Sequence, residues 1–91
     1  MNTQEAKQLE LGIRQTLHQK FGPTATIVFV EQETLATRQY FYRVSVSYQF
    51  KSPGGMISQT KLFVVDVLQS RRGWKIIVYE PILDTFIPIK S

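Results

Sequence analysis

The carboxylate of this chain best placed for chemistry is Asp66, which interrupts the otherwise apolar segment LFVVDVL. A carboxyl group buried among apolar residues can act as a general base. Tyr40, Tyr42 and Tyr48 alternate on an earlier segment and could donate hydrogen bonds to an oxyanion. The alternative is an exposed Asp66 that pairs with a basic residue of a neighbouring strand, which is the commoner fate of an aspartate. We keep Asp66 and Tyr42 as catalytic candidates of a minimal ligand-binding, lyase-type or isomerase-type domain.

A second set of residues could bind single-stranded nucleic acid. Phe41 and Arg43 share the polar side of the alternating segment, and lysines of neighbouring strands could join them. An aromatic ring among cations on a sheet is suited to stacking bases and neutralising phosphates. The net charge of +4 permits such binding, but the basic residues are spread along the chain, as on an ordinary solvated surface. The candidate binding residues are Phe41, Arg43, Lys61, Lys75, Arg71 and Arg72.

No metal or cofactor site is expected. His18 is the only histidine, the chain has no cysteine, and no acidic cluster lies near His18 in the sequence. The sequence also lacks a nucleophile elbow and a phosphate-binding loop. The main interpretation is therefore that the protein is not an enzyme.

An amphipathic helix is predicted over about residues 3–21. Thr3 suits the N-cap, and Gly22 followed by Pro23 is a typical helix end. Gly12 lies in the middle of this helix and costs about 1 kcal/mol relative to alanine, so it permits either a close approach of a strand or a bend. The apolar stripe consists of Ala6, Leu9, Ile13, Leu17 and Phe21.

Four strands are predicted after the helix, over about residues 24–31, 38–51, 57–69 and 74–80. The second alternates regularly, with six large apolar residues from Tyr40 to Phe50 on one side that need a cover. Residues 33–38 are polar enough to form a turn, and the prolines at 81 and 88 forbid a regular central strand in the tail. We expect one α+β domain over residues 1–91, in which the helix packs on a bent four-stranded antiparallel sheet.

The first, third and fourth strands are apolar on both faces. Ile27 and Phe29 alternate with Val28 and Val30, whereas one helix of about 28 Å covers a single face of a sheet. No disulfide can stabilise this small core, because cysteine is absent. The sequence therefore predicts a small non-enzymatic protein-interaction or assembly module that binds itself, as a homodimer through the sheet, or another protein. No secretory signal or membrane span is recognisable, so a cytoplasmic protein without a membrane partner is expected.

The segment LFVVDVLQSRRGWKIIVYEP resembles the nuclear-transport-factor-like (cystatin-like) superfamily through Gly73, Trp74, Lys75 and Ile76. The resemblance covers about a quarter of the chain and implies a helix on a curved antiparallel sheet. Members usually carry several helices that close a conical pocket, whereas this chain has room for one. Catalytic members place an acid or a histidine in the cone, and many others are non-catalytic dimers or secretion-system assembly domains. The Gln-x-Val-x-Gly loop of the cystatin inhibitors is missing, so protease inhibition is not implied.

Overall fold

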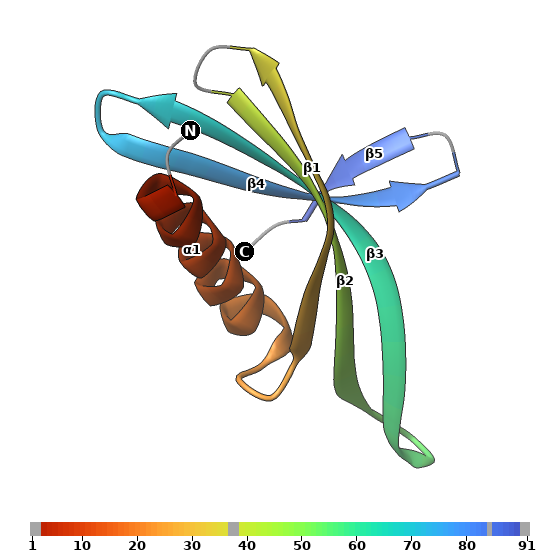
Figure 1. Ribbon diagram of the computed structural model, residues 1–91. Helices are drawn as coiled ribbons and strands as arrows, with labels where there is room; N and C mark the ends of the chain where they lie inside the picture. Colours follow the sequence, from red (N-terminus) through yellow and green to blue (C-terminus); the bar gives the residue numbers. More distant parts are fainter. Residues whose placement is uncertain (1–2, 37–38, 84, 90–91) are drawn as a thin grey trace.

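The computed structural model describes residues 3–36, 39–83 and 85–89 of the chain. Within them lie one helix and five strands, which are α1 (Thr3–Phe21), β1 (Thr26–Ala36), β2 (Gln39–Ser52), β3 (Gly55–Ser70), β4 (Gly73–Ile82) and β5 (Thr85–Pro88) (Figure 1). Each strand pairs antiparallel with the next, so the sheet order is β1-β2-β3-β4-β5. The predicted α+β class is confirmed, but the sheet has five strands instead of the predicted four.

The helix α1 has the predicted bounds. Glu5 lies in its first turn, where the helix dipole favours a carboxylate. At its other end Gly22 has a φ of 103°, and the Gly22 N–H donates a hydrogen bond of 2.9 Å to the carbonyl oxygen of His18. The His18 ring also caps this end, because Nδ1 lies 3.1 Å from the carbonyl oxygen of Gly22 and can donate to it. A structural cap accounts for the only histidine of the chain.

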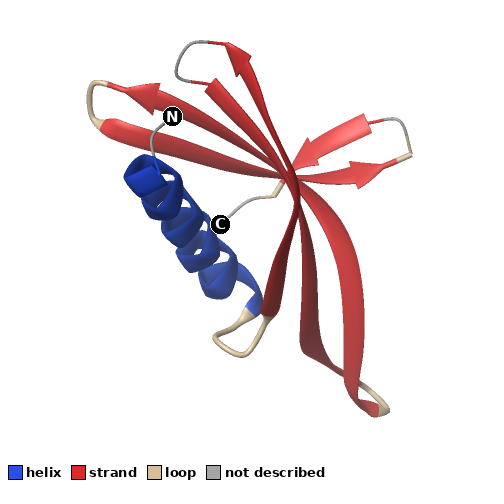
Figure 2. Cartoon of the chain, viewed as in Figure 1, coloured by secondary structure: helices blue, strands red, loops and turns tan. Residues whose placement is uncertain are grey.

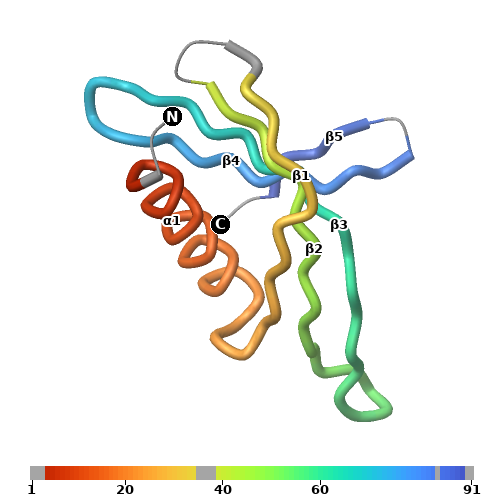
Figure 3. Tube along the Cα trace, viewed as in Figure 1, coloured from red at the N-terminus to blue at the C-terminus, as the bar shows by residue number. Residues whose placement is uncertain are grey.

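The helix covers one face of the sheet only (Figure 2). The strands are strongly twisted and spread apart on either side of a common crossing in this view (Figure 3). Leu9, Ile13 and Leu17 of α1 are almost fully buried against the covered face. The sheet residues buried there are Ile27, Tyr40, Tyr42, Val44, Val46, Phe63, Val65, Val67 and Val78.

Gly12 allows α1 to approach β4 closely. A Cβ atom at Gly12 would lie 3.4 Å from Cδ1 of Ile76, at the limit of ordinary contact. Of the two roles that the sequence left open for this glycine, a close approach is therefore the one that the structure supports.

The helix covers the apolar side of β2 only as far as Tyr48. Phe21 packs on Tyr48 with ring centroids 4.7 Å apart, and Phe50 beyond it is 38% exposed. The pairing of β1 with β2 ends at Ser47, so β2 and β3 continue as a two-stranded ribbon beyond the helix (Figure 1). The expectation that all six apolar residues are buried is wrong for Phe50.

The fifth strand corrects the prediction for the tail. β5 is an edge strand, where prolines are tolerated, and Pro88 lies opposite Tyr79 at its end. The pairing of β3 with β4 ends at Val64 and Tyr79, so Pro81 lies where β4 has only β5 as a neighbour. The prolines thus exclude a central strand but not an edge strand.

The turn predicted over residues 33–38 is also corrected. Residues 33–36 belong to β1 and not to a turn, and residues 37–38 lie outside the described part of the chain.

The backbone after β4 is strained at Leu83. Leu83 has a φ of 56° and is 97% exposed, so it adopts the left-handed region without gaining burial. A left-handed residue with a Cβ atom costs about 1–2 kcal/mol, and asparagine tolerates this region better than leucine. We expect Leu83→Asn to raise the free energy of unfolding by about 0.5–1 kcal/mol in urea denaturation.

Leu83→Ala is the matched control, because it removes the same apolar surface but keeps the strain of the Cβ atom. It should bring no comparable gain. Equal gains in the two variants would show that the exposed side chain, and not the backbone, causes the effect.

Candidate functional site

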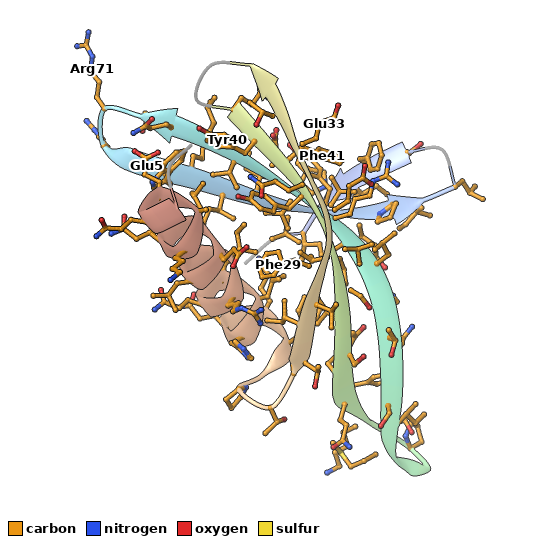
Figure 4. The ribbon with its side chains drawn as sticks, in the orientation of Figure 1. Glu5, Phe29, Glu33, Tyr40, Phe41 and Arg71 are labelled. Atoms are coloured by element: carbon orange, nitrogen blue, oxygen red, sulfur yellow. The ribbon has the colours of Figure 1, made fainter. Side chains whose placement is uncertain are left out.

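The side of the sheet opposite α1 is the candidate site, and we call it the uncovered face. The pairing registers arrange its side chains in rows that run across the strands, and three of these rows lie at Phe41, Arg43 and Ser45 of β2. Figure 4 shows Phe29 between helix and sheet, with Phe41 and Glu33 on the other side. The first row is Glu33, Phe41, Asp66 and Ile77; the second is Glu31, Arg43, Val64, Tyr79 and Pro88; the third is Val28, Ser45 and Leu62.

Large apolar side chains are exposed on this face without a cover. Val28 of β1, Leu62 and Leu68 of β3 and Phe86 of β5 are 42–55% exposed. An apolar surface of this kind on a small domain typically marks a binding surface. The uncovered face is therefore the part of the sheet where a partner is expected to pack.

A hollow of about 270 Å³ lies within the uncovered face. Its lining consists of Phe41, Val64, Asp66, Tyr79 and Phe86. The walls are mostly aromatic, and Asp66 supplies the only charged group among these lining residues. The Oδ1 atom of Asp66 is buried and accepts no hydrogen bond from any described residue. The carboxylate of Asp66 thus borders the aromatic rings and has one buried oxygen that no described residue satisfies.

The two catalytic candidates lie on opposite faces of the sheet. Asp66 is paired with Phe41, whereas Tyr42 is paired with Val65 and points to the helix side. The Tyr42 hydroxyl is buried and has no hydrogen-bond partner in the described chain, and burial chiefly raises its pKa to about 12. Tyr40 also packs on the covered side, against Trp74. The combination of Asp66 with Tyr40, Tyr42 or Tyr48 as oxyanion donors, which the sequence suggested, does not form.

The bulge in β1 brings an acidic residue onto the uncovered face. The register of β1 with β2 shifts between Phe29 and Glu31, so that Glu31 lies opposite Arg43. Without this shift Glu31 would share the covered side with Phe29. The Nε atom of Arg43 lies 3.4 Å from Oε2 of Glu31, and its guanidinium lies 5.8 Å from the centroid of Phe41. Both partners of the ion pair are about half exposed, so the pair is weak.

The other basic candidates do not gather around Phe41. Lys61 is paired with Val46 and thus lies on the helix side, where its Nζ atom is 2.7 Å from Oε1 of Glu80. This hydrogen bond raises the pKa of Lys61. Lys75 does lie on the uncovered face, opposite Leu68. Arg71 and Arg72 lie in the exposed turn between β3 and β4, and Arg71 extends away from the body in Figure 4. The expected alignment of Lys61 with Arg43 is wrong.

A second hollow of about 560 Å³ lies between α1 and β4. Thr16, Gln19, Lys20 and Phe21 line it from the helix, and Ile76–Val78 and Ile89 line it from the other side. The Ile89 N–H donates a 2.8 Å hydrogen bond to the carbonyl oxygen of Val78, so the residue after β5 continues alongside β4. Lys20 is the only charged side chain of this lining.

Sequence reasoning missed Tyr79, Phe86 and Glu31 as site residues. Phe86 is a large apolar residue of the tail, and its position opposite Pro81 depends on an edge strand that the prolines concealed. Glu31 reaches the site through a bulge, for which the sequence gives no clear signal. The alternation around Phe41 and Arg43, the candidate Asp66 and the second apolar face of the other strands all pointed to this face.

Comparisons with known proteins add nothing to this geometry. No protein-family model matches the chain, and no curated protein and no solved structure is significantly similar to it. Among the described residues, no group of histidine and carboxylate side chains could hold a metal ion. The described helix is not long and apolar enough to cross a bilayer.

The buried hydroxyl of Tyr42 gives a prediction about stability and pH. Its folded-state pKa of about 12 lies above the ordinary value of 10.0, so the unfolded chain ionises first. The ionisation of Tyr42 therefore leaves the free energy of unfolding unchanged below about pH 10 and lowers it as the pH rises toward 12. We expect Tyr42→Phe to raise the free energy of unfolding at pH 7 by about 1 kcal/mol, because an unpaired hydroxyl is removed, and to lessen the alkaline loss.

Tyr48→Phe serves as the control, since the Tyr48 hydroxyl is 3.4 Å from Oε1 of Gln59 and has a partner. Denaturation at several pH values should show no gain for this variant. A Tyr42→Phe protein less stable than the wild type would show that the hydroxyl is paired after all.

Proposed function

We propose that this protein is a small non-enzymatic interaction module that forms a homodimer through its uncovered face. The observation that carries the proposal is the set of half-exposed apolar residues on β1, β3 and β5, which α1 leaves without a cover. Face-to-face packing of two sheets about 10 Å apart would bury these residues in both copies. We also propose that the chain is cystatin-like. Members of that superfamily include non-catalytic dimers.

Charge placement also favours a second copy. The acidic Glu31 and Glu33 lie at the β1 edge of the uncovered face, whereas Lys75 lies on β4. A two-fold axis parallel to the strands, between β2 and β3, would place β1 of one copy over β4 of the other. Lys75 is two residues from Ile77, which shares the row of Glu33, so Glu33 would lie within one row of the other copy's lysine. The same arrangement hides the apolar residues and brings opposite charges together.

The size of the face predicts a dimer of moderate affinity. Four strands spaced at about 4.8 Å, each contributing roughly eight residues, give a face on the order of 500 Å². A standard stable interface buries about 800 Å² per partner. We therefore expect dissociation in the micromolar range rather than the nanomolar range.

The two competing functions have less support. The cations of the uncovered face are offset by Glu31, Glu33 and Asp66, which would repel phosphates. A catalytic Asp66 has no tyrosine donor on its own face within the described chain except Tyr79, which borders the same hollow. Single-stranded nucleic-acid binding and ligand chemistry at Asp66 are therefore the alternatives.

Sedimentation equilibrium of two matched variants tests the dimer. Leu62 on the uncovered face is 42% exposed, and Leu11 on the outer side of α1 is 56% exposed. Leu62→Glu should weaken dimerisation at least about tenfold, because it introduces a charge into the apolar contact, corresponding to about 1.4 kcal/mol or more. Leu11→Glu should leave the dimer unchanged.

A wild-type protein that is monomeric at high micromolar concentration would contradict the proposal. So would an equal effect of the two substitutions. Tight binding of a labelled single-stranded oligonucleotide that is lost in Arg43→Gln and Lys75→Gln would instead favour the nucleic-acid alternative.

A further inference from the structure

The hollow around Asp66 lacks a group that its chemistry requires. The Oδ1 atom of Asp66 is buried without a hydrogen bond from the described chain, and an unsatisfied charged oxygen is costly. Phe41, Tyr79 and Phe86 offer aromatic rings, Val64 offers no donor, and the Tyr79 hydroxyl does not donate to this oxygen. No basic or amide side chain of the described residues lines the hollow, so a charged donor for this carboxylate must come from outside it.

A cationic side chain fits this combination of groups. Ring faces attract a guanidinium or an ammonium ion, and a carboxylate beside the rings supplies the opposite charge. Arginine suits the site better than lysine, because its planar group can stack on a ring while it donates to the carboxylate. The face already holds one such contact, since the Arg43 guanidinium lies 5.8 Å from the centroid of Phe41.

The basic side chains of the same chain do not fill the hollow. Arg43 is directed to Glu31, and Lys61 lies on the other face with Glu80. Lys75 forms no ion pair with any described residue. The carboxylate of Asp66 is thus left for a group of a docked protein.

The proposed dimer supplies an arginine at the right position. With the two-fold axis between β2 and β3, β2 of one copy lies over β3 of the other. Arg43 and Val64 occupy the same row, and Val64 lines the hollow beside Asp66. We propose that Arg43 of a second copy enters this hollow, stacks on its rings and donates to Asp66. This inference rests on the proposed dimerisation through the uncovered face.

The exchange of partners costs Arg43 little. Its present ion pair with Glu31 spans 3.4 Å between groups that are about half exposed, so the pair is solvated and easily replaced. In the dimer the same guanidinium would meet the Asp66 carboxylate in a drier environment, where a charge-assisted hydrogen bond is stronger. The two-fold symmetry forms the contact twice.

A charge exchange between Asp66 and Arg43 tests the contact directly. Asp66→Arg places two arginines at each contact of its own dimer, and Arg43→Glu places two carboxylates there. Each variant alone should dissociate at least about tenfold more readily than the wild type. In an equimolar mixture, the heterodimer pairs the native Arg43 with the native Asp66 at one contact. At the other contact it pairs the two introduced side chains, which carry opposite charges. Sedimentation velocity should therefore show that mixing restores the dimer.

Lys61→Glu is the control, because it reverses a charge on the other face. It should dimerise as the wild type does and should not rescue Asp66→Arg on mixing. A mixture no more associated than its separate components would overturn the inference, as would wild-type affinity in either single variant. If Leu62→Glu still disrupts the dimer, only the contact fails and the proposed function stands.

A second measurement covers the case that Asp66→Arg does not fold. N-acetyl-arginine methylamide is titrated into the Leu62→Glu protein, with the uncharged citrulline analogue as the matched probe. Amide resonances of Phe41, Asp66 and Tyr79 should shift with the arginine probe, and Asp66→Asn should weaken binding at least about fivefold. Equal shifts with the citrulline analogue, or no effect of Asp66→Asn, would overturn the inference.

Discussion

The structure depends on the packing of a single apolar helix stripe against one face of the sheet. Leu9, Ile13 and Leu17 of α1 are buried against Val44 and other residues of that face, and Gly12 lets β4 come close. A helix of about 28 Å cannot also reach the opposite face or the end of the β2–β3 ribbon. The half-exposed residues of the uncovered face follow from this limit, because β1 and β3 are apolar on both sides. In the proposed dimer a second copy would bury these residues and would supply the complementary charges.

Strand register decides which chemistry each face can support. Asp66 pairs with Phe41, and the neighbouring Val65 pairs with Tyr42. Because successive residues of a strand point to opposite faces, the carboxylate lies on the other face from the tyrosines of the core. The bulge after Phe29 has the reverse effect, since it turns Glu31 toward Arg43. The uncovered face consequently combines rings, one unpaired carboxylate and an exposed ion pair. Such a set suits recognition of a charged side chain better than proton transfer.

The local features of the fold could be predicted from the sequence, and the non-local ones could not. The apolar stripe and the helix end at Gly22 placed α1 correctly, and the alternation from Tyr40 located β2 and its two faces. Prolines concealed β5, because the sequence does not show that β4 leaves β3 before Pro81. The sequence does not show which residues pair between strands, so it could not predict on which face of the sheet Lys61 lies. The hollow needs residues from β2, β3, β4 and β5 together, and it emerges only when the three registers between these strands are known.

Distances between two copies test the central claim most directly. The chain has no cysteine, so a single cysteine can carry a spin label without a competing site. Thr60→Cys labels the uncovered face and Gln15→Cys labels the exposed side of α1. Double electron–electron resonance on the dimer should give at most about 20 Å between labels at position 60, because the sheets are about 10 Å apart, and a much longer distance at position 15. A shorter distance at position 15 than at position 60, in a protein that sediments as a dimer, would show that the copies meet through another surface.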